Sequence, residues 1–335
     1  MSRRHWVAVV ALPLLMQGSS GLQAAGLSCE RPDVAAFTAE VVARHALDAD
    51  GLCERFGEAT IRPDVLRLIA PAPASRPPDW ARYRGNFVNA KRIRLGLEFW
   101  DDNRASLEAV TLKTGIPAAV IVALVGVETT YGSNSGRHKA FDTLATLAFE
   151  YPPRADFFRK ELESLLVLAH QQNIPVADIR SSYAGALGMP QFMPSSWRQY
   201  AVDGDGDSHI DLWRNPADVV ASVANFLVRH GWQPGQPTAL KASVEGTPEV
   251  GGGIKPDTPL GELRQQGVRT LGKAADSESG VLLRYGNGDA AEYWVGLQNF
   301  YVITRYNRSS FYAMSVVQLA EALETAVRPT VAQQP

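Results

Sequence analysis

The chain has 335 residues, of which 45% are hydrophobic and 20% are charged, and its formal net charge is -2 at pH 7. This length allows one large domain or about two to three small ones, and the composition is ordinary for a globular protein. Nothing in this composition or in the weakly negative net charge suggests a protein that binds nucleic acids.

The N-terminus resembles an export signal. Arg3 and Arg4 precede the apolar stretch 6–16, and small and polar residues follow as far as Ala25. This pattern predicts a signal peptide over residues 1–25, and it fits the general secretory route better than the twin-arginine route. The apolar stretch is too short to span a membrane as a mature helix, and no later stretch is long enough. We therefore expect an exported protein of the periplasm.

The chain has two cysteines, Cys29 and Cys53. In an exported protein such a pair is most simply one disulfide, which would close a loop around a helix expected over 37–47. Free thiols and a lipid on Cys29 are the alternatives. The residues 26–28, Gly-Leu-Ser, make a poor lipid-attachment box, so we favour a soluble form over an anchored one.

Helical periodicity dominates the first two thirds of the chain. Two sets of apolar residues recur at the spacing of an amphipathic helix, and the first set stops at Thr114 and Gly115. The sets are Ile93, Leu97, Trp100, Leu107 and Val110, and then Phe158, Leu162, Leu165, Leu166 and Ala169.

Between these sets lies an unbroken apolar run, residues 117–127, which Glu128 follows directly. The run predicts a helix buried on all sides, with Pro117 in its first position and Gly132 closing it. Burial and the negative end of the helix dipole both disfavour a charged carboxylate, so we expect a raised pKa for Glu128. A carboxyl group that keeps its proton near neutrality can act as general acid toward a sugar leaving group. The alternative is a structural glutamate that turns outward.

A segment rich in small residues, 182–196, follows the second helix. Its glycines and alanines allow close approach of a ligand, while Gln191 and Phe192 offer an amide and a flat apolar face. A sugar needs this combination of groups. Taken one by one, these residues are as consistent with a turn or a core.

An acidic loop comes next. Asp203, Asp205 and Asp207 match positions 1, 3 and 5 of an EF-hand loop, and the backbone carbonyl of His209 would fill position 7. Three carboxylates so close together repel one another, and a cation relieves that repulsion. We predict a calcium site.

The rest of this loop departs from the EF-hand pattern. Ser208 replaces the usual glycine and Arg214 replaces the final glutamate. Asp211 and Asp218 are the nearest carboxylates that could complete the shell. A solvated acidic turn is the alternative.

The amino-acid composition of the chain changes at residue 233. Gly, Pro and Thr are frequent over 233–275, which indicates a small loop-rich module, and the segments 281–285 and 292–295 predict a hairpin around residues 286–289. A last helix is expected over 312–326. Just before it, the aromatic stretch 299–312 places Tyr306 and Asn307 next to polar residues, which suits the lip of a groove.

Four segments together resemble the lytic murein transglycosylase B family. They are GVETTYG, SSYAGALGMPQFMPSSW, DGDGDSHIDLW and NFYVITRYN, and the similarity extends from Asp33 to Ala326. The resemblance implies an α+β fold, mainly α. Its expected parts are an N-terminal α domain over 26–100 completed by the C-terminal helix 311–327, a lysozyme-like catalytic core with the EF-hand-like loop over 101–232, a small β-containing module over 233–292, and a return to the core and groove over 293–310.

The resemblance also implies roles for particular residues. Glu128 is the catalytic acid and base, and one structural calcium ion is held by the acidic loop with Asp218, without a catalytic cofactor. The expected substrate contacts are Ser182 and Gln191 to acetamido and hydroxyl groups, Phe192 along the groove, Tyr306 and Asn307 around the catalytic subsite, and Tyr83, Phe157 and Tyr312 at further groove positions. Phe226 lacks the hydroxyl of the tyrosine that family members can have there.

Such enzymes are lyases that cleave the β-1,4 bond after N-acetylmuramic acid without water and leave a 1,6-anhydro end. The resemblance therefore predicts a monomeric periplasmic enzyme whose partners are peptidoglycan glycan strands and proteins of cell-wall synthesis. A hydrolytic muramidase and a non-catalytic peptidoglycan-binding protein are the alternatives.

Overall fold

The computed structural model describes residues 26–71, 79–248, 250, 253–286, 288 and 291–331. The predicted signal peptide, the final residues 332–335 and parts of the loops around 251 and 287 lie outside this range, as does the linker 72–78.

Helices make up the first two thirds of the chain, as predicted. Their bounds are α1 Pro32–His45, α2 Ala49–Gly57, α3 Pro63–Ile69, α4 Trp80–Phe87, α5 Ala90–Asp102, α6 Arg104–Thr114, α7 Ala118–Thr129, α8 Ala140–Glu150, the 3-10 turn η1 Pro152–Arg154, α9 Ala155–Gln171, α10 Pro194–Tyr200 and α11 Pro216–Arg229. A two-stranded ribbon, β1 His138–Lys139 and β2 Arg180–Ser181, pairs antiparallel beside α8.

Two helix boundaries differ from the prediction. The helix expected over 37–47 begins at Pro32, whose fixed backbone angle suits the first turn. The continuous helix expected up to Thr114 is broken at Asn103, whose side-chain amide donates to the carbonyl of Phe99 at 2.7 Å and so closes α5. Apolar spacing alone does not reveal such a break, because both helices bury the same face.

The C-terminal third builds one small sheet and two helices. Its elements are β3 Ala239–Val244, β4 Thr258–Pro259, α12 Leu260–Gln265, β5 Val268–Thr270, β6 Ser279–Tyr285, β7 Glu292–Gly296, α13 Gln298–Tyr306 and α14 Ser310–Val331. The strand order is β4-β6-β7-β3-β5, and all pairs are antiparallel. The predicted hairpin is confirmed, with Tyr285 opposite Glu292. The segment 233–275 is more regular than expected, since it contains three strands and a helix.

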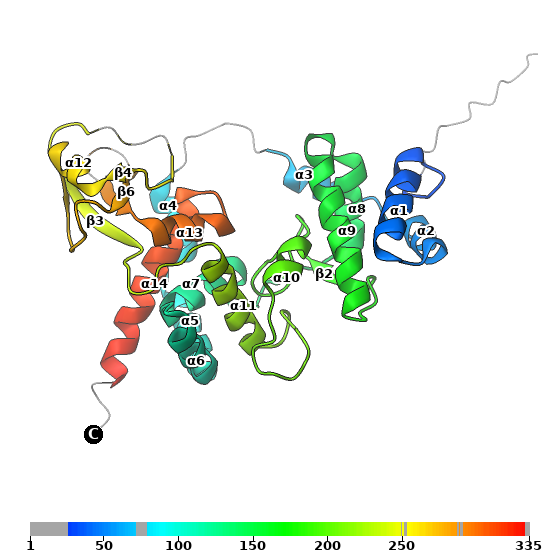
Figure 1. The fold of residues 1–335 in the computed structure, drawn as a ribbon, viewed down its shortest axis with the longest axis horizontal. Helices are drawn as coiled ribbons and strands as arrows, with labels where there is room; N and C mark the ends of the chain where they lie inside the picture. The colour runs from blue at the N-terminus through cyan, green and yellow to red at the C-terminus, as the bar shows by residue number, and fades with distance from the viewer. Residues whose placement is uncertain are drawn as a thin grey trace, which may run out of the picture.

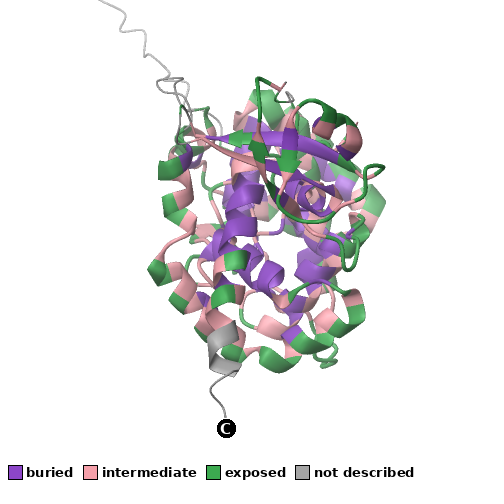
Figure 2. Ribbon diagram, turned by 90° about the vertical axis from the view of Figure 1, so that its left-hand side faces the viewer, coloured by how far each residue is buried: buried purple, intermediate pink, exposed green. Residues whose placement is uncertain are grey.

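The buried helix α7 lies at the centre of the molecule, and α14, α5, α6 and α11 pack around it (Figure 1). Figure 2 shows the buried residues gathered on inner helices and along strands of the sheet. The sheet has a small apolar cluster of its own, which includes Leu240, Leu263 and Val295.

The helices of the expected N-terminal domain lie in two places. α4 and α5 pack on α14, whereas α1 packs on α2 and α9, at the opposite end of Figure 1. Residues 26–100 thus contribute to both ends of the molecule. The domain boundaries themselves stay a prediction.

The disulfide between Cys29 and Cys53 is confirmed, with their Cα atoms 5.5 Å apart. It joins the start of α1 to α2. Phe37 and Phe56 from these helices pack edge to face, with ring centroids 6.0 Å apart, and both contact the ring of Phe149 on α8. The cross-link therefore holds the first two helices against α8.

We expect the double variant Cys29→Ser/Cys53→Ser to lose about 3 kcal/mol of unfolding free energy, because the cross-link restricts the unfolded chain. Urea unfolding followed by tryptophan fluorescence measures this loss. Reduced wild type is the control and should unfold at the same urea concentration as the variant. A loss below about 0.5 kcal/mol would contradict a stabilising role.

In the described part of the chain, no individual helix combines the length and the apolar character needed to cross a membrane. The pair α6 and α7 meets that requirement only jointly, and a bend of 119° separates its members.

Candidate active site

Glu128 lies in the last turn of α7, whose residues from Ala119 to Val127 are all buried. The helix ends earlier than predicted. Thr130, not Gly132, takes the left-handed conformation that closes it, and Pro117 is the residue before the helix rather than its first member. Thr130 and Tyr131 have φ angles of 53° and 57°. Residues other than glycine rarely adopt this left-handed backbone conformation. Backbone strain of this kind is concentrated at functional sites in proteins.

The side chain of Thr129 stabilises this strained turn. Its hydroxyl donates to the carbonyl of Met189 at 2.9 Å and accepts from the amide of Gly132 at 2.9 Å. The turn that carries Glu128 is thereby attached to the segment 182–196. The sequence analysis did not assign this role to Thr129, although a hydroxyl at a helix end is a known signal for such contacts.

The Glu128 side chain is half-buried among the described residues, and its Oε1 atom accepts a hydrogen bond from the hydroxyl of Tyr312 at 2.5 Å. Burial raises the pKa of Glu128 to about 7, and the hydrogen bond from Tyr312 opposes the increase. This agrees with the raised pKa expected from the sequence. A group with this pKa holds its proton in a large fraction of molecules at neutral pH and can also release it.

Two further tyrosines surround Glu128. The pKa values of Tyr83 and Tyr306 are raised, first by burial and then by the negative charge of Glu128. Tyr306 donates to the carbonyl of Pro190 at 2.7 Å, and so fastens α13 to the segment 182–196. The structure thus brings three predicted groove tyrosines, from α4, α13 and α14, around the carboxyl group.

Phe192 is buried against other aromatic rings. It is only 2% exposed, and its ring packs against Tyr306 and Phe226 with centroids 5.7 Å from each. A ring buried to this extent supports the tyrosine from behind and presents no open face to a sugar. The ring centroid of Phe226 lies 4.7 Å from that of Tyr306, so Phe226 also packs against this tyrosine.

The side chains of Ser182 and Gln191 form hydrogen bonds to backbone groups in and around the segment 182–196. The Ser182 hydroxyl accepts from the amides of Ala184 and Ala186 at 3.3 and 3.1 Å. The Gln191 amide group donates to the carbonyls of Gly188 and Ser135 at 2.9 and 3.2 Å. The hydroxyl proton of Ser182 and the side-chain carbonyl of Gln191 are the groups left for a ligand.

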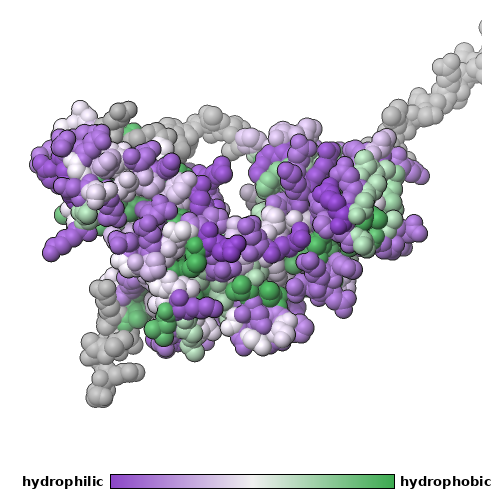
Figure 3. Space-filling model, in the orientation of Figure 1, coloured by the Kyte–Doolittle hydropathy of each residue, from purple (hydrophilic) through white to green (hydrophobic). Residues whose placement is uncertain are grey.

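Two further predicted contacts are exposed in the described structure. Phe157 on α9 is 37% exposed, and the guanidinium group of Arg154 lies 4.1 Å from its ring centroid. Asn307 is exposed just after α13, and its carbonyl accepts from Ser309. Figure 3 shows a hollow between the part of the molecule with α4 and α13 and the part with α3, α8 and α9. An open hollow of this kind suits a long ligand better than a small ligand that needs to be enclosed.

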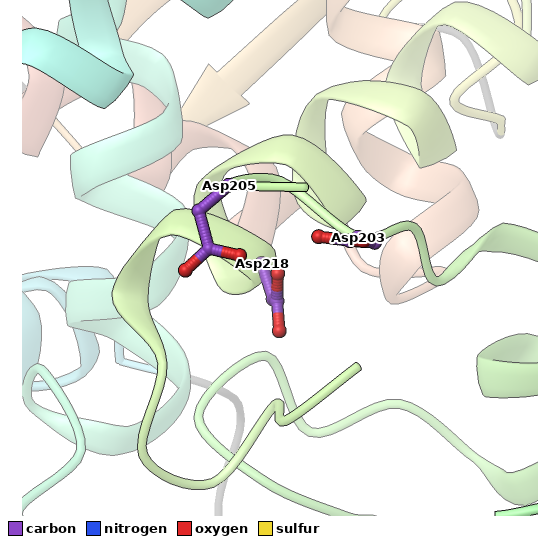
Figure 4. A group of neighbouring side chains, drawn as sticks. All are labelled: Asp203, Asp205 and Asp218. Atoms are coloured by element: carbon purple, nitrogen blue, oxygen red, sulfur yellow. The ribbon is translucent and has the colours of Figure 1, made fainter. Parts of the chain in front are cut away.

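A second group of carboxylates forms a candidate metal centre. Oxygens of Asp203, Asp205 and Asp218 lie within 4.8 Å of one another. Figure 4 shows the three side chains together. Asp218 is fully buried on α11 and accepts from the amides of Gly204 and Asp211, each at 2.7 Å. Burial nevertheless raises the pKa of Asp218. An oxygen-only set of this kind, in which Asp218 is buried and Asp205 is exposed, suits a hard cation such as Ca²⁺.

The two carboxylates that could complete this set differ in their positions. Asp211 accepts from the amides of Trp213 and Arg214 at 2.8 and 3.0 Å and so caps its own turn. Asp218 instead joins the group. Asp207 is not among the carboxylates of this group, and its carboxylate accepts from the amide of His209 at 2.7 Å; its role as a ligand stays a prediction. The predicted role of the His209 carbonyl stays a prediction.

The chain is similar to known proteins over most of its length. Residues 30–321 match the family described as "Transglycosylase SLT domain". Membrane-bound lytic murein transglycosylase B of Escherichia coli strain K12 is 37% identical over 313 residues, which are 91% of this chain and 86% of that protein.

Two solved structures share the fold. Soluble lytic transglycosylase SltB1 from Pseudomonas aeruginosa has a TM-score of 0.85 and 43% identity, over 89% of this chain and 100% of that one. The Escherichia coli lytic transglycosylase Slt35 in complex with calcium has a TM-score of 0.82 and 37% identity, over 90% of this chain and 96% of that one.

Proposed function

Since the chain belongs to the transglycosylase SLT domain family and is a peptidoglycan lytic transglycosylase with a lysozyme-like fold, we propose that Glu128 is its catalytic acid and base. The supporting observation is a desolvated carboxyl group with a pKa of about 7, held by the Tyr312 hydroxyl at the end of a fully buried helix. A group of that pKa can both give and take a proton at neutral pH.

The reaction breaks the β-1,4 bond between N-acetylmuramic acid and N-acetylglucosamine. Glu128 donates its proton to the glycosidic oxygen, and the bond from that oxygen to the anomeric carbon breaks. The acetamido oxygen of the muramic acid stabilises the positive charge at this carbon. The Glu128 carboxylate then takes the proton of the 6-hydroxyl, whose oxygen attacks the same carbon. Glu128 is again protonated, no water is consumed, and a 1,6-anhydro end remains.

The surroundings of Glu128 support a mechanism with one carboxyl group. Glycosidases normally place two carboxyl groups on either side of the bond. Here burial and the Tyr312 hydroxyl set the pKa of Glu128, and no second carboxylate acts on it among the described residues. The substrate's own acetamido group supplies what a second carboxylate would.

We also propose that Ser182 and Gln191 bind the acetamido and hydroxyl groups of the glycan, since the structure leaves one polar group free on each. Tyr83 and Tyr306 would contact the sugar at the site of cleavage, and the buried Tyr312 would hold Glu128 there through its hydroxyl. The contacts of Phe157 and Asn307 with more distant sugars stay predictions, and so does a groove position for the buried Phe192.

A calcium ion fits the group formed by Asp203, Asp205 and Asp218, supported by the oxygen-only donor set and by the calcium complex of the related Slt35. When bound, the ion would neutralise the repulsion among these carboxylates and stabilise the loop. It has no part in the chemistry proposed for Glu128.

We propose that the protein acts in the periplasm as a soluble monomer. The signal-like residues 1–25 support export. The disulfide leaves no free thiol on Cys29 for a lipid. Proteins of cell-wall synthesis stay predicted partners. Fractionation of cells that make the full chain tests the anchoring directly, and recovery in the membrane fraction would overturn it.

The products of digestion test the proposed reaction. Purified peptidoglycan should yield muropeptides with 1,6-anhydro ends, which mass spectrometry finds lighter by one water than the reducing ends that a hydrolase makes. Reducing ends as the sole product would favour a muramidase.

The variant Tyr312→Phe tests how the pKa of Glu128 is set. The Tyr312 hydrogen bond lowers this pKa, so its loss should raise the pKa and move the alkaline limb of the pH–activity curve to higher pH. A displacement of about 1 to 2 pH units is expected for one hydrogen bond to a charged group. Tyr301→Phe, on the same segment, is the matched control. An unchanged or acid-shifted limb in Tyr312→Phe would contradict this assignment.

A further inference from the structure

A second pocket lies beside the β1–β2 ribbon. It encloses about 430 Å³, and its lining side chains are Arg62, Asp64, Arg67, Leu68, Arg137 and His138. Three arginines therefore face one carboxylate around this space. No residue of the pocket has a part in the chemistry proposed for Glu128.

The one carboxylate in the pocket is already engaged. The guanidinium group of Arg62 donates to both oxygens of Asp64, at 3.1 and 3.0 Å. This contact lowers the pKa of Asp64 to about 2. Arg67 and Arg137 are exposed and form no ion pair within the described ranges. Their two positive charges are left uncompensated at the pocket.

His138 adds an unsatisfied group to this pocket. Its Nδ1 atom is buried and has no hydrogen-bond partner among the described residues, and the nearest carboxylate oxygen, on Asp64, is 3.8 Å away. Buried polar atoms without a partner are uncommon in folded proteins and point to a ligand or a water.

The pocket is next to the segment proposed to bind the glycan. His138 pairs with Ser181 in the ribbon, one residue before Ser182. The backbone at Gly136 lies close to Ser182: a Cβ atom added to Gly136 would be only 2.5 Å from the amide nitrogen of Ser182. The Gln191 side chain donates to the carbonyl of Ser135. Both residues proposed to bind sugar thus contact the stretch that leads into the pocket.

We propose that this pocket binds carboxylates of the peptide that is attached to N-acetylmuramic acid in peptidoglycan. The inference rests on the proposed function, because it requires the glycan to lie along Ser182 and Gln191. The sugars of the strand carry no free acid where the peptide is attached, so the negative charges of the substrate lie on the peptide. Guanidinium groups bind carboxylates in a two-pronged geometry. Leu68, which is 54% exposed, offers an apolar contact to a small side chain such as alanine.

The test compares glycan strands of equal length with and without their peptides, the latter prepared with an amidase. Wild type should show the lower KM for the peptide-bearing strand. In Arg67→Gln/Arg137→Gln this KM should rise by about five- to tenfold, while kcat and the KM for the stripped strand stay unchanged. The variant Arg67→Lys/Arg137→Lys keeps both positive charges but loses the two-pronged guanidinium geometry. Its KM for the peptide-bearing strand should lie between those of wild type and Arg67→Gln/Arg137→Gln.

The matched control is Arg198→Gln/Arg229→Gln, which removes two exposed arginines on α10 and α11 and should change neither KM. An equal effect of the pocket variant on both strands, or none on either, would overturn the proposal. So would displacement of a synthetic stem tripeptide by equimolar inorganic phosphate in a titration, since it indicates a phosphate site. If neither strand gives anhydro products, the proposed function fails, and the titration with the tripeptide still decides the role of the pocket.

Discussion

Replacing Glu128 by glutamine is expected to lower the turnover of purified peptidoglycan by roughly a thousandfold or more, because one group supplies both proton transfers. The amide of glutamine has nearly the shape of the carboxyl group but cannot exchange a proton at neutral pH. Release of soluble muropeptides, quantified by chromatography, measures the loss. Glu98→Gln, an exposed position on α5 with an ion pair to Arg94, is the matched control and should keep full activity.

The same variant should also gain stability above neutral pH. The folded pKa of Glu128, about 7, lies above its ordinary value of 4.5, so the native state binds this proton more tightly than the unfolded state does. The associated stabilisation is present below about pH 4.5 and is lost as the pH rises through 7, up to about 3 kcal/mol. Glutamine has no such loss. At pH 8 the variant should therefore melt at a higher temperature than wild type.

These two measurements together separate a catalytic from a structural role. A structural glutamate would give a variant that is both inactive and less stable. Full activity in Glu128→Gln would remove the basis of the proposed mechanism.

The second large effect is expected from Asp218→Asn. The Asp218 carboxylate accepts two backbone hydrogen bonds, from Gly204 and Asp211, in a fully buried position. An asparagine places an amide donor against one of these N–H groups and removes the charge that a cation needs. We expect a loss of about 2 to 4 kcal/mol in unfolding free energy with calcium present.

Treatment with a chelator separates the stabilisation by a bound calcium ion from the stabilisation by the Asp218 hydrogen bonds. In wild type, removal of calcium should lower the melting temperature by several degrees, and addition of calcium should restore it. The Asp218→Asn variant should no longer respond to either treatment. Asp102→Asn, exposed at the end of α5, is the control and should respond as wild type does. A wild-type melting temperature that is independent of calcium would exclude the metal site.

Local pattern was sufficient for much of the fold. The run 117–127 contains no charge, and it forms the fully buried α7 with Glu128 in its last turn. The turn residues around 286–289 lie between two apolar segments, and these pair as β6 and β7. In such cases the information is local, because the period of apolar residues determines which face of an element can be buried.

Local pattern failed where a single side chain ends an element. The Asn103 amide breaks the helix expected through this position, and Thr129 with Thr130 closes α7 before Gly132. These outcomes depend on hydrogen bonds that compete with the regular pattern.

By itself, the sequence determined the buried helix, the acidic residue at its end, the disulfide pair and the acidic loop, since each is encoded by neighbouring residues. Only the tertiary structure decided what surrounds them. It brought the Tyr312 hydroxyl to Glu128 across 184 positions of sequence, placed Asp218 rather than Asp211 in the carboxylate group of the acidic loop, and buried Phe192 behind Tyr306. The physical reason is that a pKa, a metal shell or an open ring face depends on what lies nearby in space, and packing among distant segments sets that environment.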